Sequence, residues 1–180
     1  MQTNKRQNLF SPSLLAVGAI LSALSILLGK YFAINVGDTI RLSFENLPIL
    51  LAGVYFGPWL ACAVGIVADL VGCLLVGYTI NPIITLGAAL IGIVSGICSR
   101  LPLKASILKI SVAVLLSHLI GSVVTKTIGL YVFYQMPFFA TLGWRTITYG
   151  IISVLEITIL FILSKSHTFS LQMKKMQNGK

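Results

Sequence analysis

The sequence predicts an all-α fold, an integral membrane bundle of about six transmembrane helices. Of its 180 residues, 57% are apolar and only 9% are charged, and the mean hydropathy is +0.97. A soluble domain carries about 25% charged residues, so a chain this poor in charge cannot cover a water-facing surface. The apolar runs use most of the chain, and we therefore expect a single membrane domain over residues 1–180.

A transmembrane helix needs about 20 apolar residues, and turn residues divide the chain into runs of about this length. The first run follows Lys5 and Arg6 and could pass for a secretory signal, but it lacks a small-residue cleavage site, so we interpret it as a retained span. Pro48 near the start of the second run is tolerated there, and Gly57-Pro58 and Asn81-Pro82 mark breaks. The predicted spans lie near 13–31, 44–57, 59–77, 82–99, 107–133 and 144–164.

Basic residues predict the orientation, because cytoplasmic loops are enriched in lysine and arginine. An even number of spans places both termini on one side, which receives nine of the 13 basic residues: Lys5, Arg6, Arg100, Lys104, Lys109, Lys165, Lys174, Lys175 and Lys180. We expect a multi-pass protein of the plasma membrane with both termini in the cytoplasm. This topology accounts for the net charge of +9, and no nucleic acid partner is needed.

The other four basic residues, Lys30, Arg41, Lys126 and Arg145, fall at the outer ends of predicted spans. Cations on this side oppose the insertion bias. One interpretation is that their side chains extend to the membrane interface. The other is an outward-facing anion site, in which arginine binds a carboxylate through two parallel hydrogen bonds.

Ionisable residues inside spans are costly and suggest functional sites. Asp69 shares a face of the third span with Gly65 and Cys73. Its carboxylate suits the amidine-like edge of a heterocycle, although a structural partnership with a lysine or with backbone groups is equally open.

Polar residues form stripes on the last two spans and predict the walls of a cavity. One stripe is His118, Ser122 and Lys126, and the other is Arg145, Tyr149, Ser153 and Glu156, where Glu156 lies deeper and is expected to be structural. Aromatic residues, among them Phe44 and Tyr131, gather at the same outer ends. They fit an interfacial belt, or for a few of them stacking on a planar ligand.

Small residues four apart let helix backbones approach closely in lipid. Ala19 and Ala23 form such a step in the first span, and others occur at Gly53–Gly57 and along 88–96. At least one of these faces is expected to contact a partner protein.

Sequence motifs for chemistry are missing from the chain. It contains no GxxxxGK(S/T) phosphate loop, no GxSxG, no HExxH and no acidic cluster. The three cysteines lack metal-ligand spacing and the two histidines, His118 and His167, are far apart. We therefore expect no ATPase or other enzyme activity, no cofactor and no metal site.

Three stretches of the chain form a distinctive set: TIRLSFENLPI at 39–49 continuing to Phe56-Gly57-Pro58, GIVADLVG at 65–72, and Asn81-Pro82 followed by 85–89. Together they resemble the S components of energy-coupling factor (ECF) vitamin transporters. The resemblance covers nearly the whole chain and is strongest to the folate-specific S component. The Ala19–Ala23 step matches the family's helix that packs on the shared coupling subunit.

The resemblance implies a subunit that binds folate from outside and delivers it inward, together with a transmembrane coupling protein and two ATP-binding subunits in other chains. S components for riboflavin, thiamine or pantothenate remain alternatives, as does a membrane assembly or structural protein. The expected substrate-binding residues are Arg41, Phe44, Asp69, Asn81, Lys126, Tyr131, Arg145 and Tyr149. Asp69 is expected to receive the pterin, and Arg41, Lys126 or Arg145 the carboxylates.

Overall fold

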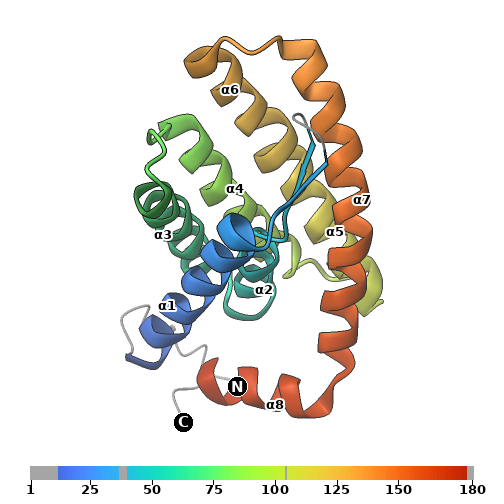
Figure 1. Cartoon of the computed structure of the whole chain (residues 1–180). Coiled ribbons are helices and arrows are strands. Elements are labelled where there is room, and N and C mark those ends of the chain that lie inside the picture. The colour runs from blue at the N-terminus through green and yellow to red at the C-terminus, as the bar shows by residue number, and fades with distance from the viewer. Residues whose placement is uncertain (1–11, 37–39, 104, 178–180) are drawn as a thin grey trace.

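The structure is a computed structural model that describes residues 12–36, 40–103 and 105–177, with only the backbone of Asn35, Val36, Ile40, Arg41, Ser170, Lys174 and Gln177. Lys5, Arg6, Lys104 and Lys180 of the predicted topology lie outside the described residues. The described chain is a bundle of helices with one short β-hairpin (Figure 1). The predicted all-α membrane fold is confirmed.

Four helical stretches within the described residues are long and apolar enough to cross a membrane. They are α1 (Pro12–Ile26) with the π-helical turn η1 (Leu27–Tyr31), α3 (Pro58–Val76), the continuous stretch of α5 (Ser106–Ser117), η2 (His118–Thr125, π-helical) and α6 (Lys126–Tyr134), and α7 (Phe138–Lys165). Two shorter apolar helices complete the predicted spans, α2 (Leu47–Phe56) and α4 (Pro82–Cys98).

The boundaries follow the local sequence. Pro48, Pro58 and Pro82 lie in the first turns of α2, α3 and α4, where a helix loses no hydrogen bond to proline. The last span begins at Phe138 rather than near 144, directly after Pro137. Polar residues in 141–146 lower the local hydropathy but do not end the helix, because lipid still favours internally paired backbone.

The hairpin of β1 (Ile34–Val36) and β2 (Ile40–Leu42) connects η1 to α2, with Asn35 opposite Arg41. It extends from the η1 end towards α7, which β2 contacts (Figure 1). The sequence did not predict these strands. A turn at Glu45 and Asn46 follows the hairpin, so α2 begins only at Leu47 and has 10 residues.

Helix α8 (His167–Gln177) is a second feature that was not predicted, and it lies across one end of the bundle (Figure 1). Phe169, Met173 and Met176 pack against the apolar core, and the Phe169 ring meets Tyr55 edge-on at 5.6 Å. This i, i+4, i+7 spacing gives α8 one apolar face. The core built from α1, α2, α3, α4, α5 and α7 thus lies in the half of the bundle next to α8.

Candidate functional site

A cavity of about 300 Å³ opens in the other half of the bundle, towards the end where α6 and α7 meet. It narrows into an extension of about 20 Å³ that shares Lys30, Glu45, Asp69 and Lys126 with it. The main cavity is lined by Lys30, Ser43, Glu45, Asp69, Cys73, Tyr78, Thr79, Asn81, Ile84, Lys126, Leu130, Tyr134, Met136, Arg145 and Tyr149. Every transmembrane stretch except α2 thus contributes to its wall.

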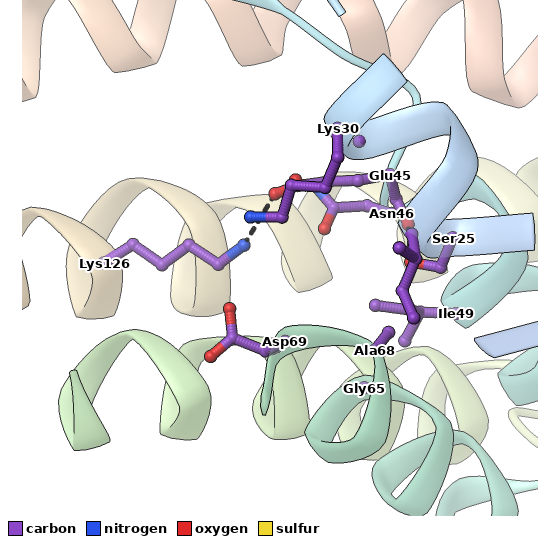
Figure 2. A pocket seen from close by; sticks show the side chains of 12 residues that line it. Ser25, Lys30, Glu45, Asn46, Ile49, Gly65, Ala68, Asp69 and Lys126 are labelled. Atoms are coloured by element: carbon purple, nitrogen blue, oxygen red, sulfur yellow. Dashed lines mark hydrogen bonds and ion pairs between the residues drawn. The ribbon is translucent and has the colours of Figure 1, made fainter. Parts of the chain in front are cut away.

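Lys126 and Glu45 form an ion pair at the junction of the two spaces (Figure 2). The Lys126 ammonium lies 3.0 Å from Glu45 Oε1, and the whole Lys126 residue is only 5% exposed. Burying an unpaired ammonium is costly in a low-dielectric interior. Glu45 therefore holds Lys126 charged inside the bundle and fixes its direction.

Asp69 projects from α3 towards the same junction (Figure 2). Its Oδ2 accepts a hydrogen bond of 2.6 Å from the Thr85 hydroxyl on α4. Its Oδ1 has no hydrogen-bond partner among the described residues. One carboxylate oxygen is thus held in place while the other remains able to accept from a ligand.

Arg145 reaches the cavity from α7. Its Nε donates to the Ser122 carbonyl at 2.8 Å, and Nη2 lies 3.4 Å from the Tyr149 hydroxyl. Lys30 lies opposite, with its ammonium 5.3 Å from the Tyr78 ring centroid. Neither cation forms an ion pair with a described carboxylate. The cavity therefore presents two cations that form no ion pair within the described part of the chain.

The two predicted polar stripes meet behind this wall. His118 Nδ1 is 3.0 Å from the Ser122 hydroxyl, and His118 Nε2 contacts the Glu156 carboxylate. The His118 ring stacks on Tyr149 with 5.0 Å between centroids. The i+4 periodicity of both stripes thus places their members on facing sides of η2 and α7.

Five of the predicted site residues line the cavity: Asp69, Asn81, Lys126, Arg145 and Tyr149. Asn81 also has a structural task, because its Oδ1 caps α4 through the Ile83 and Ile84 amides and its Nδ2 donates to the Gly129 carbonyl. Phe44 and Tyr131 are not among the lining residues, and Tyr131 is exposed and packs edge-on against Phe138. The Arg41 side chain lies outside the described atoms.

Several lining residues were not among the expected binding residues, above all Glu45, whereas Lys30 was named only as one of four cations of a possible anion site. Lys30 stood out as a cation at an outer end, and Glu45 is one of only four acidic residues in the chain. The rarity of acids was an available signal for Glu45. Ser43, Cys73, Tyr78 and Thr79 carried no comparable signal, because such residues are common at the ends of membrane helices.

The predicted partner surface lies on the outside of α1. Ala16, Ala19 and Ala23 are exposed, whereas Leu14, Val17 and Leu21 on the other face of the helix are buried. A small-residue strip thus remains open on the membrane-facing side of α1.

Comparisons with known proteins agree with this architecture. A family profile described as "ECF transporter, substrate-specific component" matches residues 13–165. A crystal structure described as FolT bound with folic acid matches with a TM-score of 0.70 and 26% sequence identity, over 85% of this chain and 93% of that chain. No curated protein sequence matches significantly. The extent of the profile match shows that the chain belongs to the family of ECF transporter substrate-specific components.

Proposed function

We propose that this substrate-specific component binds folate in the cavity between η1, α3, α6 and α7. The observation that supports it most is that one cavity contains the Asp69 carboxylate, with one oxygen left to accept a hydrogen bond, and two cations without an ion-pair partner among the described residues, Lys30 and Arg145. Folate has a matching set of groups, a pterin with adjacent N–H donors, a benzoyl ring and a glutamate with two carboxylates. The likeness to FolT bound with folic acid supports the same ligand.

In this proposal Asp69 accepts hydrogen bonds from the amino group and ring N–H of the pterin. Arg145 and Lys30 bind the carboxylates, while the rings of Tyr78 and Tyr149 line the wall, with the Tyr149 ring already stacked on His118. Lys126 lines the cavity as expected, but Glu45 already balances its charge. We therefore expect Lys126 to donate hydrogen bonds to neutral acceptor atoms of the ligand and not to bind one of its carboxylates.

Direct titration tests the proposal. Purified protein in detergent, titrated with folate by calorimetry, is expected to bind one equivalent with high affinity. Riboflavin, thiamine and pantothenate in excess are expected not to displace it. Absence of a folate signal from correctly folded protein would refute the assignment, and mass spectrometry of a co-purified ligand would identify another vitamin directly.

We further propose that transport requires a transmembrane coupling protein and two ATP-binding subunits, with both termini of this chain in the cytoplasm. The exposed strip of Ala16, Ala19 and Ala23 on α1 is assigned to the coupling protein. Small side chains suit close helix contact in lipid, where apolar burial gives little driving force.

Ala19→Trp and Ala23→Trp are expected to abolish folate uptake by cells that express the complete transporter, while folate binding to the purified subunit stays unchanged. The bulky ring blocks the partner surface, whereas the cavity lies on the far side of α1. Gly150→Trp is the matched control, because Gly150 on α7 faces open space. Uptake lost equally in the control, or binding lost together with uptake, would contradict this role of α1.

A further inference from the structure

A second layer of polar side chains lies behind the cavity wall and takes no direct part in the lining. His118 is 2% exposed, and Ser122 and Glu156 are fully buried. They join η2 to α7 through the contacts of His118 with Ser122 and Glu156, and Asn46 donates to the Ser122 hydroxyl at 3.4 Å. We call His118, Ser122 and Glu156 the rear network.

Stability alone gives little reason for such a network. Buried ionisable pairs lose hydration that their mutual attraction repays only in part, and apolar side chains of similar volume often stabilise a protein as well or better. In a membrane bundle the cost is greater still. One carboxylate oxygen, Glu156 Oε1, is moreover buried without a hydrogen-bond partner in the described chain.

On the side of the cavity, the rear network contacts Arg145 and Tyr149. The carbonyl of Ser122 accepts from Arg145 Nε at 2.8 Å, and the ring of His118 stacks on Tyr149 at 5.0 Å. Arg145 also donates a hydrogen bond to the Tyr149 hydroxyl, and these are the two residues that α7 contributes to the lining. The network thus supports the wall of the cavity that carries the Arg145 guanidinium.

The local backbone also fits this role. Residues His118–Thr125 form a π-helix, in which the Lys126 amide donates to the Gly121 carbonyl five residues earlier. Single π-helical turns inside α-helices occur frequently at functional sites. Here the segment contains the Ser122 carbonyl that holds Arg145.

We infer that the Glu156–His118–Ser122 network is a positioning device that holds Arg145 in the orientation needed to bind a ligand carboxylate. Glu156 anchors the imidazole, and His118 stacks on Tyr149 and contacts the Ser122 hydroxyl. The Ser122 backbone carbonyl and the Tyr149 hydroxyl then hold the guanidinium through its Nε and one terminal nitrogen. The remaining guanidinium N–H groups are left for the ligand. The network therefore selects ligands that carry a carboxylate, and this inference rests on the proposed folate function.

The test compares two ligands on Glu156→Gln, a change that keeps the side-chain shape and removes the charge. The ligands are folate and folate diamide, which has the same rings and length but amides in place of both carboxylates. The dissociation constant for folate is expected to rise about tenfold, a change of about 1.4 kcal/mol, and that for the diamide to remain within about twofold of the wild-type value. Ser164→Ala, at the α8 end of the same helix, is the control and leaves both affinities unchanged.

A double-mutant cycle tests whether Glu156 acts on the ligand through Arg145. Arg145→Ala alone is expected to weaken folate binding, and adding Glu156→Gln to it is expected to cause no further loss, since the network acts only through Arg145. Equal weakening for both ligands, or additive losses in the cycle, would overturn the inference and leave a structural role. If Glu156→Gln does not fold, His118→Gln removes the ring that stacks on Tyr149 and is expected to give the same outcomes. Wild-type protein that fails to bind folate would instead refute the proposed function.

Discussion

Asp69→Asn is expected to raise the dissociation constant for folate about a hundredfold, because hydrogen bonds to a charged acceptor contribute about 1.5–3 kcal/mol. Asparagine keeps the shape of the side chain and one oxygen acceptor. Its amide nitrogen, however, would point a donor at the donor groups of the pterin. The loss should appear in calorimetric titration of the purified variant, whose thermal stability is expected to stay close to that of the wild type.

The folate diamide gives an internal check on this result. Asp69 is assigned to the pterin end of the ligand, so Asp69→Asn should weaken binding of folate and of the diamide by the same factor. Thr85→Val keeps the Asp69 carboxylate and removes the hydroxyl that donates to it and also lies 3.2 Å from the Asn81 carbonyl, and it is expected to weaken binding less than about tenfold. If Asp69→Asn binds folate like the wild type, the pterin is not held by this carboxylate.

The membrane fold was predictable because lipid restricts the choice of structure. Every backbone polar group must be paired within a spanning helix, so uninterrupted apolar runs mark the spans, and proline and glycine mark their ends. The predicted boundaries agree with α3 and α4 to within one residue. Part of the cavity lining was also predictable, because residues four apart in a helix share one face. Lys126, Arg145 and Tyr149 were identified in this way.

Contacts between residues distant in sequence were not predictable. Lys126 and Glu45 are 81 residues apart, and His118 and Glu156 are 38 apart. The periodicity of a helix indicates which residues share a face, but it does not indicate which neighbouring helix that face will contact. The hairpin was missed for a related reason, because strands of three residues carry too short a pattern to distinguish from a loop.

The small-residue steps show what tertiary packing adds to a sequence pattern. The step along 88–96 was noted in the sequence, but its role depends on what faces it. A Cβ added at Gly92 would lie 2.4 Å from the carbonyl group of Ala61, and one added at Gly96 would lie 2.4 Å from the backbone of Pro58. These glycines thus let α3 and α4 approach backbone to backbone. Since α3 carries Asp69 and α4 carries Thr85, this contact also sets the geometry of the cavity.

Gly92→Ala is therefore expected to destabilise the protein by about 3 kcal/mol, the upper part of the usual range for overpacking. The atoms in the way belong to the backbone of Ala61, so no side-chain rotation can relieve the overlap and the two helices must separate. Gly92→Leu is expected to yield no folded protein. Thermal unfolding in detergent and size-exclusion chromatography measure the two effects.

Gly150→Ala is the matched control for this change. Both glycines lie inside helices and both gain about 1 kcal/mol of helix propensity as alanine, but a Cβ at Gly150 meets nothing within 4 Å. The control should leave the unfolding temperature unchanged or slightly raised, so the difference between the two variants isolates the packing of α3 on α4. Folate affinity of any surviving Gly92→Ala protein should fall as well, because Asp69 and Thr85 move apart. Equal stability of the two variants would mean that α3 and α4 do not pack through Gly92.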